Sequence, residues 1–465
     1  MGPGLILICL ACSLRYGFSM DKFVAAVYEH VPFFPDPSQV PVTRTEALAL
    51  MNRNIDVLET AVKTAAQKIP DPAVNWIPCN DPHRFGQAPV QERLSCIAKH
   101  NSIYFAANFG DKKHCNASDP RCPPDGYYFY DTTVVFGPEG KLLARYHKYH
   151  LFLGESLFNV PEEPEISTFD TPFGRFGIII CYDILFYNPA VILVTDHNVD
   201  TVIFTNAWFN TLPHYSAIQF HSSWALAMRV NLLSSNVHNI SLDMTGSGIF
   251  APDKLGPYYY NNTVNDGHLL ISELNSHTRN STECSPVQWD EYASQIKKPL
   301  PSSKVFSGKL MLDNYTMTAL TELQGCASVC HHHLCCHLNY SMLEKRNDEV
   351  YILGAYNGYH GPHQVFYIEV CTLVKCMNGD NCDIATDSAY TKFKWFSLAG
   401  TFQSTIVYPE VLHSGVQLDG EMFQVLKDGR LVSQPKISSK ALLSVTLLGR
   451  NYMKDPKNLN ISAMS

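Results

Sequence analysis

The chain has 465 residues, of which 46% are hydrophobic and 17% are charged. This composition is typical of a globular protein of two or three domains. The formal net charge of -8 gives no reason to expect a nucleic-acid partner or an anionic membrane surface, because both attract basic proteins.

The N-terminus carries a short apolar run from Leu5 to Cys12, followed by the polar residues 13–15. The run is too short to span a bilayer and is typical of the core of a secretory signal peptide. We therefore expect residues 1–20 to be a signal peptide and the mature protein to be secreted. The polar C-terminal stretch over 454–462 predicts neither a transmembrane tail nor a GPI-attachment signal in this form.

Two further features suit an exported protein. Asn-x-Ser/Thr sequons, the acceptor sites of N-glycosylation, occur at Asn116, Asn239, Asn261, Asn280, Asn314, Asn339 and Asn460. The chain has 15 cysteines, of which Cys9 and Cys12 leave with the signal peptide. If Cys181 is set aside, the remaining even set predicts a disulfide framework, whose connectivity stays open. Cys115 and Cys122 are close enough in sequence to close a small loop.

Strand-like and helical patterns alternate from Lys22 to about Leu274. We expect strands over 23–28, 103–109, 133–136, 142–146, 176–180 and 201–205, and helices after the capping box Thr43-x-x-Glu46 and over 90–98 and 217–233. This alternation predicts a layered α/β architecture. One break interrupts it, because the first helix runs directly into a proline-punctuated loop over 69–79 and the next element is again a helix. A crossover helix normally returns the chain to the sheet, so one strand is missing here.

Cys181 ends the apolar run over 176–180, which predicts a buried strand. Asn188-Pro189-Ala190 soon afterwards is typical of the beginning of a helix. A thiol between the two lies near backbone N–H groups and the positive end of a helix dipole, which lower a thiol pKa and favour a nucleophilic thiolate. A buried core cysteine and half of a disulfide are the alternatives, and the parity of the cysteines favours a free catalytic thiol.

Residues 283–304 are polar and contain Lys298-Pro299-Leu300-Pro301, which predicts a linker. Beyond the linker we expect short strands over 351–356, 365–374, 393–398, 405–408, 423–425 and 442–448, with a hairpin turn at Asp428-Gly429. The second domain is therefore expected to be rich in β-structure and to hold most of the disulfides.

Lys148 and the segment over 176–185 together resemble the nitrilase (carbon–nitrogen hydrolase) superfamily, whose site is a Glu–Lys–Cys triad. More specific motifs are Asn75-Trp76-Ile77-Pro78-Cys79, Arg145-Tyr146-His147-Lys148, Met244-Thr245-Gly246-Ser247-Gly248-Ile249 and Leu334-Cys335-Cys336-His337-Leu338. They resemble the vanin (pantetheinase) family, a close relative of biotinidase. The resemblance covers essentially the whole mature chain.

The resemblance implies a fold and its boundaries. It implies a nitrilase-like αββα sandwich, here with one strand missing, followed by a smaller all-β C-terminal domain. We place the hydrolase domain over 21–282, the linker over 283–304 and the C-terminal domain over 305–465.

The resemblance also implies a chemistry. Cys181 would attack an amide carbonyl and form a thioester that water cleaves, while Lys148 would stabilise the oxyanion and favour the thiolate. The implied substrate is pantetheine, which yields pantothenate and cysteamine, and no metal or organic cofactor is implied. Trp208 is a candidate to line the substrate pocket, with a core role as the alternative.

The family places its general-base Glu on the strand that is missing here, so the chain resembles a vanin that lacks one continuous segment. Glu155 is the better replacement candidate, because relatives often carry a second carboxylate there that positions Lys148 or the hydrolytic water. Glu59 and Glu92 are expected to be solvated. Loss of a positioned general base costs about 10²–10⁴ in rate.

Three functions stay open: a vanin-type amidase of reduced activity, a biotinidase-like amidase, and a secreted pseudoenzyme that binds a ligand without turnover. A zinc site at His331, His332 and His333 beside Cys330, Cys335 and Cys336 is a further alternative. We favour disulfides at these cysteines, since they align with a family disulfide pattern and the expected compartment is oxidising.

Overall fold

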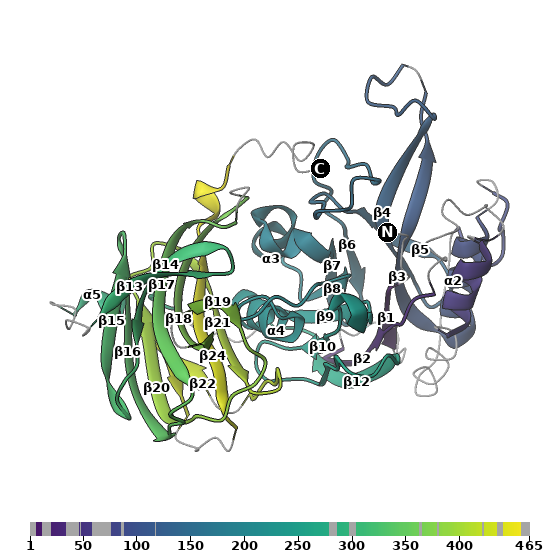
Figure 1. Ribbon diagram of the computed structural model, residues 1–465. Coiled ribbons are helices and arrows are strands. Elements are labelled where there is room, and N and C mark those ends of the chain that lie inside the picture. Colours follow the sequence, from purple (N-terminus) through teal and green to yellow (C-terminus); the bar gives the residue numbers. More distant parts are fainter. Residues whose placement is uncertain are drawn as a thin grey trace. The chain divides into compact units, whose positions relative to one another are not determined.

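The computed structural model divides the chain into two compact units (Figure 1). One unit contains residues 1–209, 228–280 and 461–465, and the other contains residues 210–227 and 281–460. The structure describes residues 6–11, 20–33, 46, 48–57, 76–84, 88–116, 118–278, 286–296, 304–361, 365–378, 381–420, 423–434 and 440–456. No helix among these residues is both long enough and apolar enough to cross a membrane.

Two six-stranded sheets form the first unit. The first sheet is antiparallel and has the order β12-β2-β1-β3-β4-β5, with strands β1 (Ile6–Ala11), β2 (Lys22–Glu29), β3 (Ile103–His114), β4 (Tyr127–Phe136), β5 (Leu142–His147) and β12 (His268–Asn275). The second sheet has the order β11-β10-β9-β8-β7-β6, with strands β6 (Thr168–Thr171), β7 (Gly174–Ile180), β8 (Thr201–Asn206), β9 (Asn231–Asn236), β10 (Ser247–Phe250) and β11 (Tyr258–Tyr259). Strands β7, β8 and β9 are parallel.

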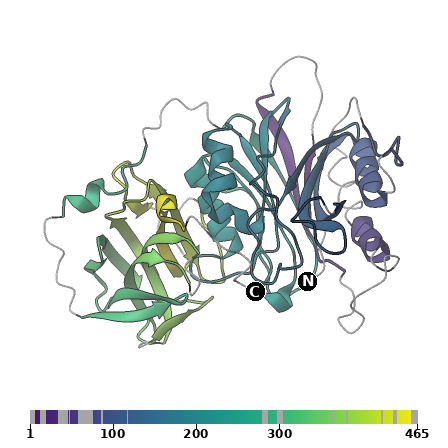
Figure 2. The same ribbon diagram turned by 90° about the horizontal axis from the view of Figure 1, so that it is seen from above.

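Helices cover the outer faces of these sheets. Helix α2 (Pro89–Asn101) and the helical residues 48–57 bury Leu94, Ile97 and Ile55 against strands of the first sheet. Figure 2 shows these two helices, in purple and blue, on the outer side of that sheet. On the second sheet, Gly177 of β7 leaves room for Leu193 of helix α3 (Ile192–Thr195). The predicted αββα class is confirmed.

Strand β1 of the first sheet comes from residues that precede the expected hydrolase domain. It lies between β2 and β3 and pairs antiparallel with both (Figure 1). Without a strand between them, β2 and β3 would each have an edge with unpaired N–H and C=O groups. The extended segment β1 forms hydrogen bonds with both edges. The same residues form the expected core of the signal peptide, which stays a prediction. The sequence of β1, Ile-Leu-Ile-Cys-Leu-Ala, contains no carboxylate, so β1 restores the hydrogen-bonded ladder without the family's Glu.

The expected helix over 217–233 is too long. Helix α4 (Ala217–Met228) is followed by Arg229, whose φ of 60° is left-handed, and β9 begins at Asn231. The apolar residues continue through both elements, so the spacing does not mark the boundary. The expected helix at Asn188 begins instead as a short turn, η3 (Tyr187–Val191), that leads into α3.

The second unit confirms the expected β-rich domain. A seven-stranded sheet has the order β13-β14-β17-β18-β24-β21, with β19 paired to β18. Its strands are β13 (Val305–Leu310), β14 (Asp313–Ala319), β17 (Val350–Tyr359), β18 (Tyr367–Asn378), β19 (Asn381–Ala385), β21 (Ile406–His413) and β24 (Leu442–Arg450). A five-stranded sheet orders β15 (Gln324–His331), β16 (Leu334–Glu344), β20 (Lys392–Gly400), β23 (Leu431–Ser433) and β22 (Phe423–Val425). Within the expected linker, α5 (Glu291–Ser294) is helical.

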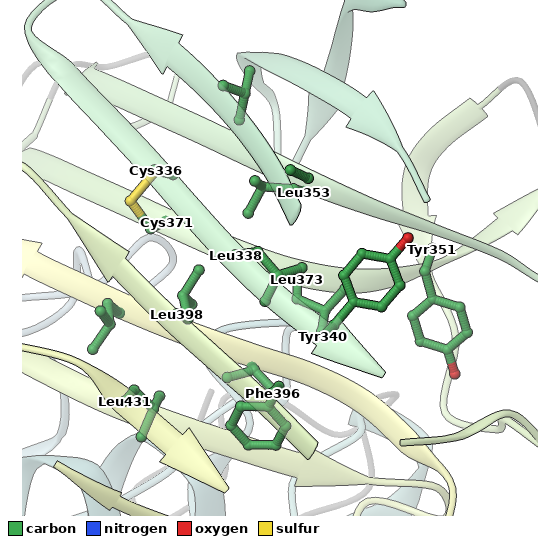
Figure 3. Packing of buried hydrophobic residues seen from close by; sticks show 14 of the residues in the cluster. Cys336, Leu338, Tyr340, Tyr351, Leu353, Cys371, Leu373, Phe396, Leu398 and Leu431 are labelled. Atoms are coloured by element: carbon green, nitrogen blue, oxygen red, sulfur yellow. A yellow bond between two sulfur atoms is a disulfide. The ribbon is translucent and has the colours of Figure 1, made fainter. Parts of the chain in front are cut away.

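The core of the second unit lies between its two sheets (Figure 3). Leu353 and Leu373 come from the seven-stranded sheet, and Leu338 and Leu398 come from the five-stranded sheet. A disulfide between Cys336 of β16 and Cys371 of β18 links the two layers within this core. The hairpin turn predicted at Asp428-Gly429 joins β22 to β23, and Gly429 has a φ of 87°.

A buried carboxyl in the second unit predicts a pH-dependent stability. Glu410 of β21 is 1% exposed, and burial raises the pKa of its carboxyl well above the ordinary value of 4.5. Because the pKa in the folded state is raised, the stabilisation is fully present below pH 4.5 and is lost as the pH rises above it. We expect the free energy of unfolding to fall with pH from there toward neutrality, by up to ~1.4 kcal/mol per unit.

Urea unfolding of wild type and Glu410→Gln between pH 5 and 8 measures this effect. The amide has no carboxyl to titrate, so its variant should show a flatter dependence of stability on pH. Glu344→Gln, at an exposed position, is the matched control and should keep the wild-type slope. Parallel slopes for wild type and Glu410→Gln would contradict the prediction.

Candidate active site

Cys181 lies at a sharp turn directly after β7. Its backbone has a φ of 48°, in the left-handed region that residues other than glycine rarely adopt. A single 3-10 turn, η2 (Cys181–Leu185), begins at this residue. The side chain is 7% exposed, and its thiol is free of any disulfide. The structure therefore confirms a free thiol at the end of a buried strand.

Asp183 connects this turn to the segment that carries Lys148. Its Oδ2 accepts hydrogen bonds from the Tyr146 hydroxyl at 2.9 Å and from the Ile180 N–H at 3.2 Å. Its Oδ1 accepts the N–H of His150 at 2.8 Å. Burial raises the pKa of Asp183 to about 7, although these donors oppose the shift. One buried carboxyl thus holds the two segments together, a role that the sequence analysis missed.

Lys148 follows β5, and its side chain is 1% exposed. The Nζ atom lies 2.7 and 2.5 Å from the two carboxylate oxygens of Glu155 and 3.7 Å from Oδ2 of Asp131. Burial disfavours the ammonium, but the negative charges of a Cys181 thiolate, Glu155 and Asp131 raise the pKa of Lys148 above its ordinary value. The lysine therefore stays protonated and places a fixed positive charge near Cys181.

The sequence predicts a Cys181 thiolate, and burial acts against it. Burial raises the pKa of the Cys181 thiol to about 11. The Lys148 charge and a hydrogen bond from the backbone of Ala207 lower the pKa only in part, and the nearby carboxylates raise it further. The five-residue turn that begins at Cys181 is also shorter than the helix on which the prediction relied. Because burial favours the protonated thiol, its attack on an amide needs a group that accepts the proton.

The Glu155 carboxylate binds the Lys148 ammonium. Both carboxylate oxygens contact the ammonium, and Oε2 also accepts the N–H of Phe152 at 2.7 Å. A carboxylate bound in this way holds the lysine in position. The other two glutamates do not join this cluster in the described structure. Glu92 lies on α2, which covers the outer face of the first sheet, and Glu59 lies outside the described residues.

Trp208 follows β8, two residues after the strand ends. It is 7% exposed, and its backbone exchanges hydrogen bonds with the side chain of Asn236. Its neighbour Ala207 donates the N–H that reaches Cys181. Trp208 therefore lies near the nucleophile, and its role in substrate binding stays a prediction.

Among the described residues, five disulfides join Cys79 to Cys96, Cys115 to Cys122, Cys330 to Cys335, Cys336 to Cys371, and Cys376 to Cys382. The predicted bridge between Cys115 and Cys122 is confirmed. Cys326 is exposed and free, and Cys284 lies outside the described residues.

The structure places the proposed zinc ligands in other interactions. The three cysteines beside the histidines are in disulfides, so they offer no thiolate to a metal. His333 Nε2 lies 2.7 Å from Glu369. In the part of the chain that the structure describes, His, Cys, Asp and Glu side chains form no cluster suited to a metal ion.

The sequons differ in exposure. Asn116 and Asn314 are exposed, whereas Asn239, Asn261 and Asn339 are half-buried. Asn280 and Asn460 lie outside the described residues.

Comparison with known proteins identifies the family. Residues 19–236 match the carbon-nitrogen hydrolase family, and residues 304–455 match the vanin C-terminal domain. The chain is 50% identical to the pantetheinase of Canis lupus familiaris, over 97% of this chain and 92% of that protein. It is 50% identical to the pantetheinase of Homo sapiens, over 94% and 90%. The biotinidase of Bos taurus is 36% identical, over 94% and 93%.

The alignment with the canine pantetheinase is longer than this chain. It contains 480 positions, more than the 465 residues of this chain, so the canine protein has residues without a counterpart here. This agrees with the missing segment inferred from the motifs. The two family matches and the identity over nearly the full length show that the chain belongs to the vanin (pantetheinase) family of carbon–nitrogen hydrolases.

Proposed function

We propose that this chain hydrolyses the amide of pantetheine to pantothenate and cysteamine. The observation that carries the proposal is the buried cluster of Cys181, Lys148 and Glu155, found in a chain that is half identical to pantetheinases over nearly its whole length. Glu155 positions Lys148, Lys148 stabilises negative charge, and Cys181 is the nucleophile.

The reaction divides into two halves. Cys181 loses its proton, its sulfur bonds to the amide carbonyl carbon, and the carbonyl oxygen becomes an oxyanion that the Lys148 ammonium stabilises. Cysteamine leaves as the carbon–nitrogen bond breaks and takes up one proton. Water then attacks the thioester, releases pantothenate and returns the proton to the sulfur. Lys148 is an ammonium while the oxyanion is present, because the surrounding negative groups raise its pKa.

The alternatives differ in substrate or in turnover. A biotinidase-like activity is less supported, since the identity to biotinidase is 36% against 50% for the pantetheinases. A pseudoenzyme requires that no carboxylate in this chain replaces the family's Glu.

A pantothenate-release assay on the purified chain tests the proposal. Wild type should release pantothenate above the rate of Cys181→Ala. Equal background rates for both proteins would reject the proposed function. Cleavage of biocytin in place of pantetheine would reassign the substrate.

Secretion and glycosylation belong to the same proposal. Five disulfides in one chain are typical of an oxidising compartment. We expect the chain to be secreted with glycans at its exposed sequons, Asn116 and Asn314. The mobility of the secreted protein before and after enzymatic deglycosylation measures this directly, and an unchanged mobility would reject glycosylation.

A further inference from the structure

The active site needs a proton acceptor that the family's missing segment does not supply here. Burial favours the protonated form of Cys181, and strand β1 contains no carboxylate. Glu155 uses both of its oxygens on Lys148. Among the residues that the structure describes, a second carboxylate lies near Lys148.

Asp131 of β4 is such a carboxylate. Its Oδ1 accepts a hydrogen bond from Asn108 Nδ2 at 2.6 Å, and its Oδ2 lies 3.7 Å from Lys148 Nζ. The Lys148 backbone N–H also donates to the carbonyl oxygen of Asp131 at 2.9 Å. The Asp131 side chain is 13% exposed, so it is largely desolvated.

Strand register places Asp131 on the inner side of its sheet. Thr133, two residues along β4 and thus on the same face, meets Thr205 of β8 at 2.7 Å between the hydroxyl oxygens. Thr205 pairs in register with Ile180, the residue before Cys181. The face that carries Asp131 therefore looks toward the sheet that carries the nucleophile.

Asp131 also lies between Lys148 and the position of the missing strand. Asn108, its hydrogen-bond donor, is on β3, and β3 is the neighbour of the position that β1 occupies. Asn108 lies on β3, Asp131 lies on β4, and β5 leads to Lys148. These three strands are neighbours in the sheet. A carboxylate on the central one of these three strands is near the lysine without help from the missing segment.

We propose that Asp131 is the proton acceptor for Cys181 in this chain and that it acts through Lys148. One N–H bond of the Lys148 ammonium breaks as an O–H bond forms on Asp131 Oδ2, and the lone pair left on Nζ then takes the proton of Cys181 as its S–H bond breaks. The ammonium is regenerated, and the charges change only on sulfur and on Asp131. The reverse relay delivers the proton to the leaving amine.

Two further observations support this relay. The 3.7 Å separation is long for a hydrogen bond, but catalytic hydrogen bonds in unliganded sites are often long and tighten when substrate binds. Burial raises the pKa of Asp131, against the opposing effect of Lys148, and a more basic carboxylate is a better acceptor. Asp131 is a positioning residue, since it acts through Lys148, and the proposal rests on the proposed function.

The test uses Asp131→Asn in the full chain and two readouts. The first is pantothenate release, for which we expect kcat to fall by about 10²–10⁴ with little change in KM. The second is the rate at which iodoacetamide alkylates Cys181, measured between pH 6 and 9 in a Cys326→Ser background that removes the exposed thiol. Asp125→Asn, at an exposed position, is the matched control and should behave as wild type in both assays.

The alkylation profile distinguishes a relay from a purely electrostatic role. With the relay, wild type should react at a rate that is independent of pH over part of the neutral range, because the proton moves inside the cluster. Asp131→Asn should lose this plateau and react more slowly at pH 7. Without the relay, removal of a negative charge lowers the thiol pKa, so the variant would react faster, and this result would overturn the proposal.

The experiment still tests the relay if wild type is inactive or if the variant does not fold. If wild type releases no pantothenate, the proposed function fails, and the alkylation profile still decides the role of Asp131. If Asp131→Asn does not fold, the wild-type profile alone decides, because a rate that rises tenfold per pH unit without a plateau rejects the relay. Asp131→Glu should restore part of the plateau.

Discussion

Replacement of Cys181 by alanine should reduce pantothenate release by at least about 10⁴-fold, the scale seen when a catalytic nucleophile is removed. The sulfur forms the covalent intermediate, and neither Lys148 nor Glu155 can replace it in that step. The thiol forms no disulfide and the substitution removes a single sulfur atom, so the fold should be retained. Steady-state hydrolysis and thermal unfolding of the same preparation measure the two effects.

Cys326→Ser is the matched control for this experiment. Cys326 is also a free thiol, but it is exposed on β15 in the second unit. We expect this variant to keep the wild-type rate and to keep covalent labelling of Cys181 by an amide-like electrophile. A loss of activity in Cys326→Ser, or labelling at Cys326 alone, would contradict the assignment of the nucleophile.

Lys148→Met should lower both catalysis and stability. Without the ammonium the oxyanion loses its positive partner, and removal of one such donor costs about 10²–10³ in kcat. The variant also leaves the carboxylates of Glu155 and Asp131, whose side chains are 20% and 13% exposed, without their shared cation. Breaking a buried ion pair from one side costs about 3–5 kcal/mol. Urea unfolding and steady-state kinetics measure the two effects.

Lys112→Met provides the control for the lysine substitution. Lys112 of β3 is exposed, and its ion pair with Asp125 at 3.8 Å is exposed on both sides. Surface pairs of this kind contribute about 0–1 kcal/mol. If Lys148→Met were as stable and as active as Lys112→Met, the buried cluster would have neither of the roles assigned to it.

The nucleophile and the lysine were predictable because each occurs in a local pattern. The apolar run before Cys181 predicts a strand that ends at the thiol, and the structure places the end of β7 at Ile180. Lys148 and Glu155 were expected from the resemblance to the nitrilase superfamily, which implies a lysine and a second carboxylate at these positions. The contacts of Nζ with both Glu155 oxygens connect two residues that are only seven positions apart.

Asp131 and Asp183 were not predictable in the same way. Asp131 is one polar residue in the strand pattern of β4, and its proximity to Lys148 depends on the pairing of β4 with β5. Asp183 contacts Tyr146 and His150 across a long interval of sequence. Periodicity indicates which residues share a face of a strand, but it does not identify the strand that lies alongside.

Taken alone, the sequence determined the family and the two kinds of domain and made Cys181 the expected nucleophile, because motifs and local periodicity carry this information. The tertiary structure decided the burial of Cys181 and the neighbours of Lys148. It also placed Ile6–Ala11 in the interior of the first sheet. These properties depend on burial and on strand pairing between distant segments, because desolvation and nearby charges, not the local sequence, set the pKa of a buried group.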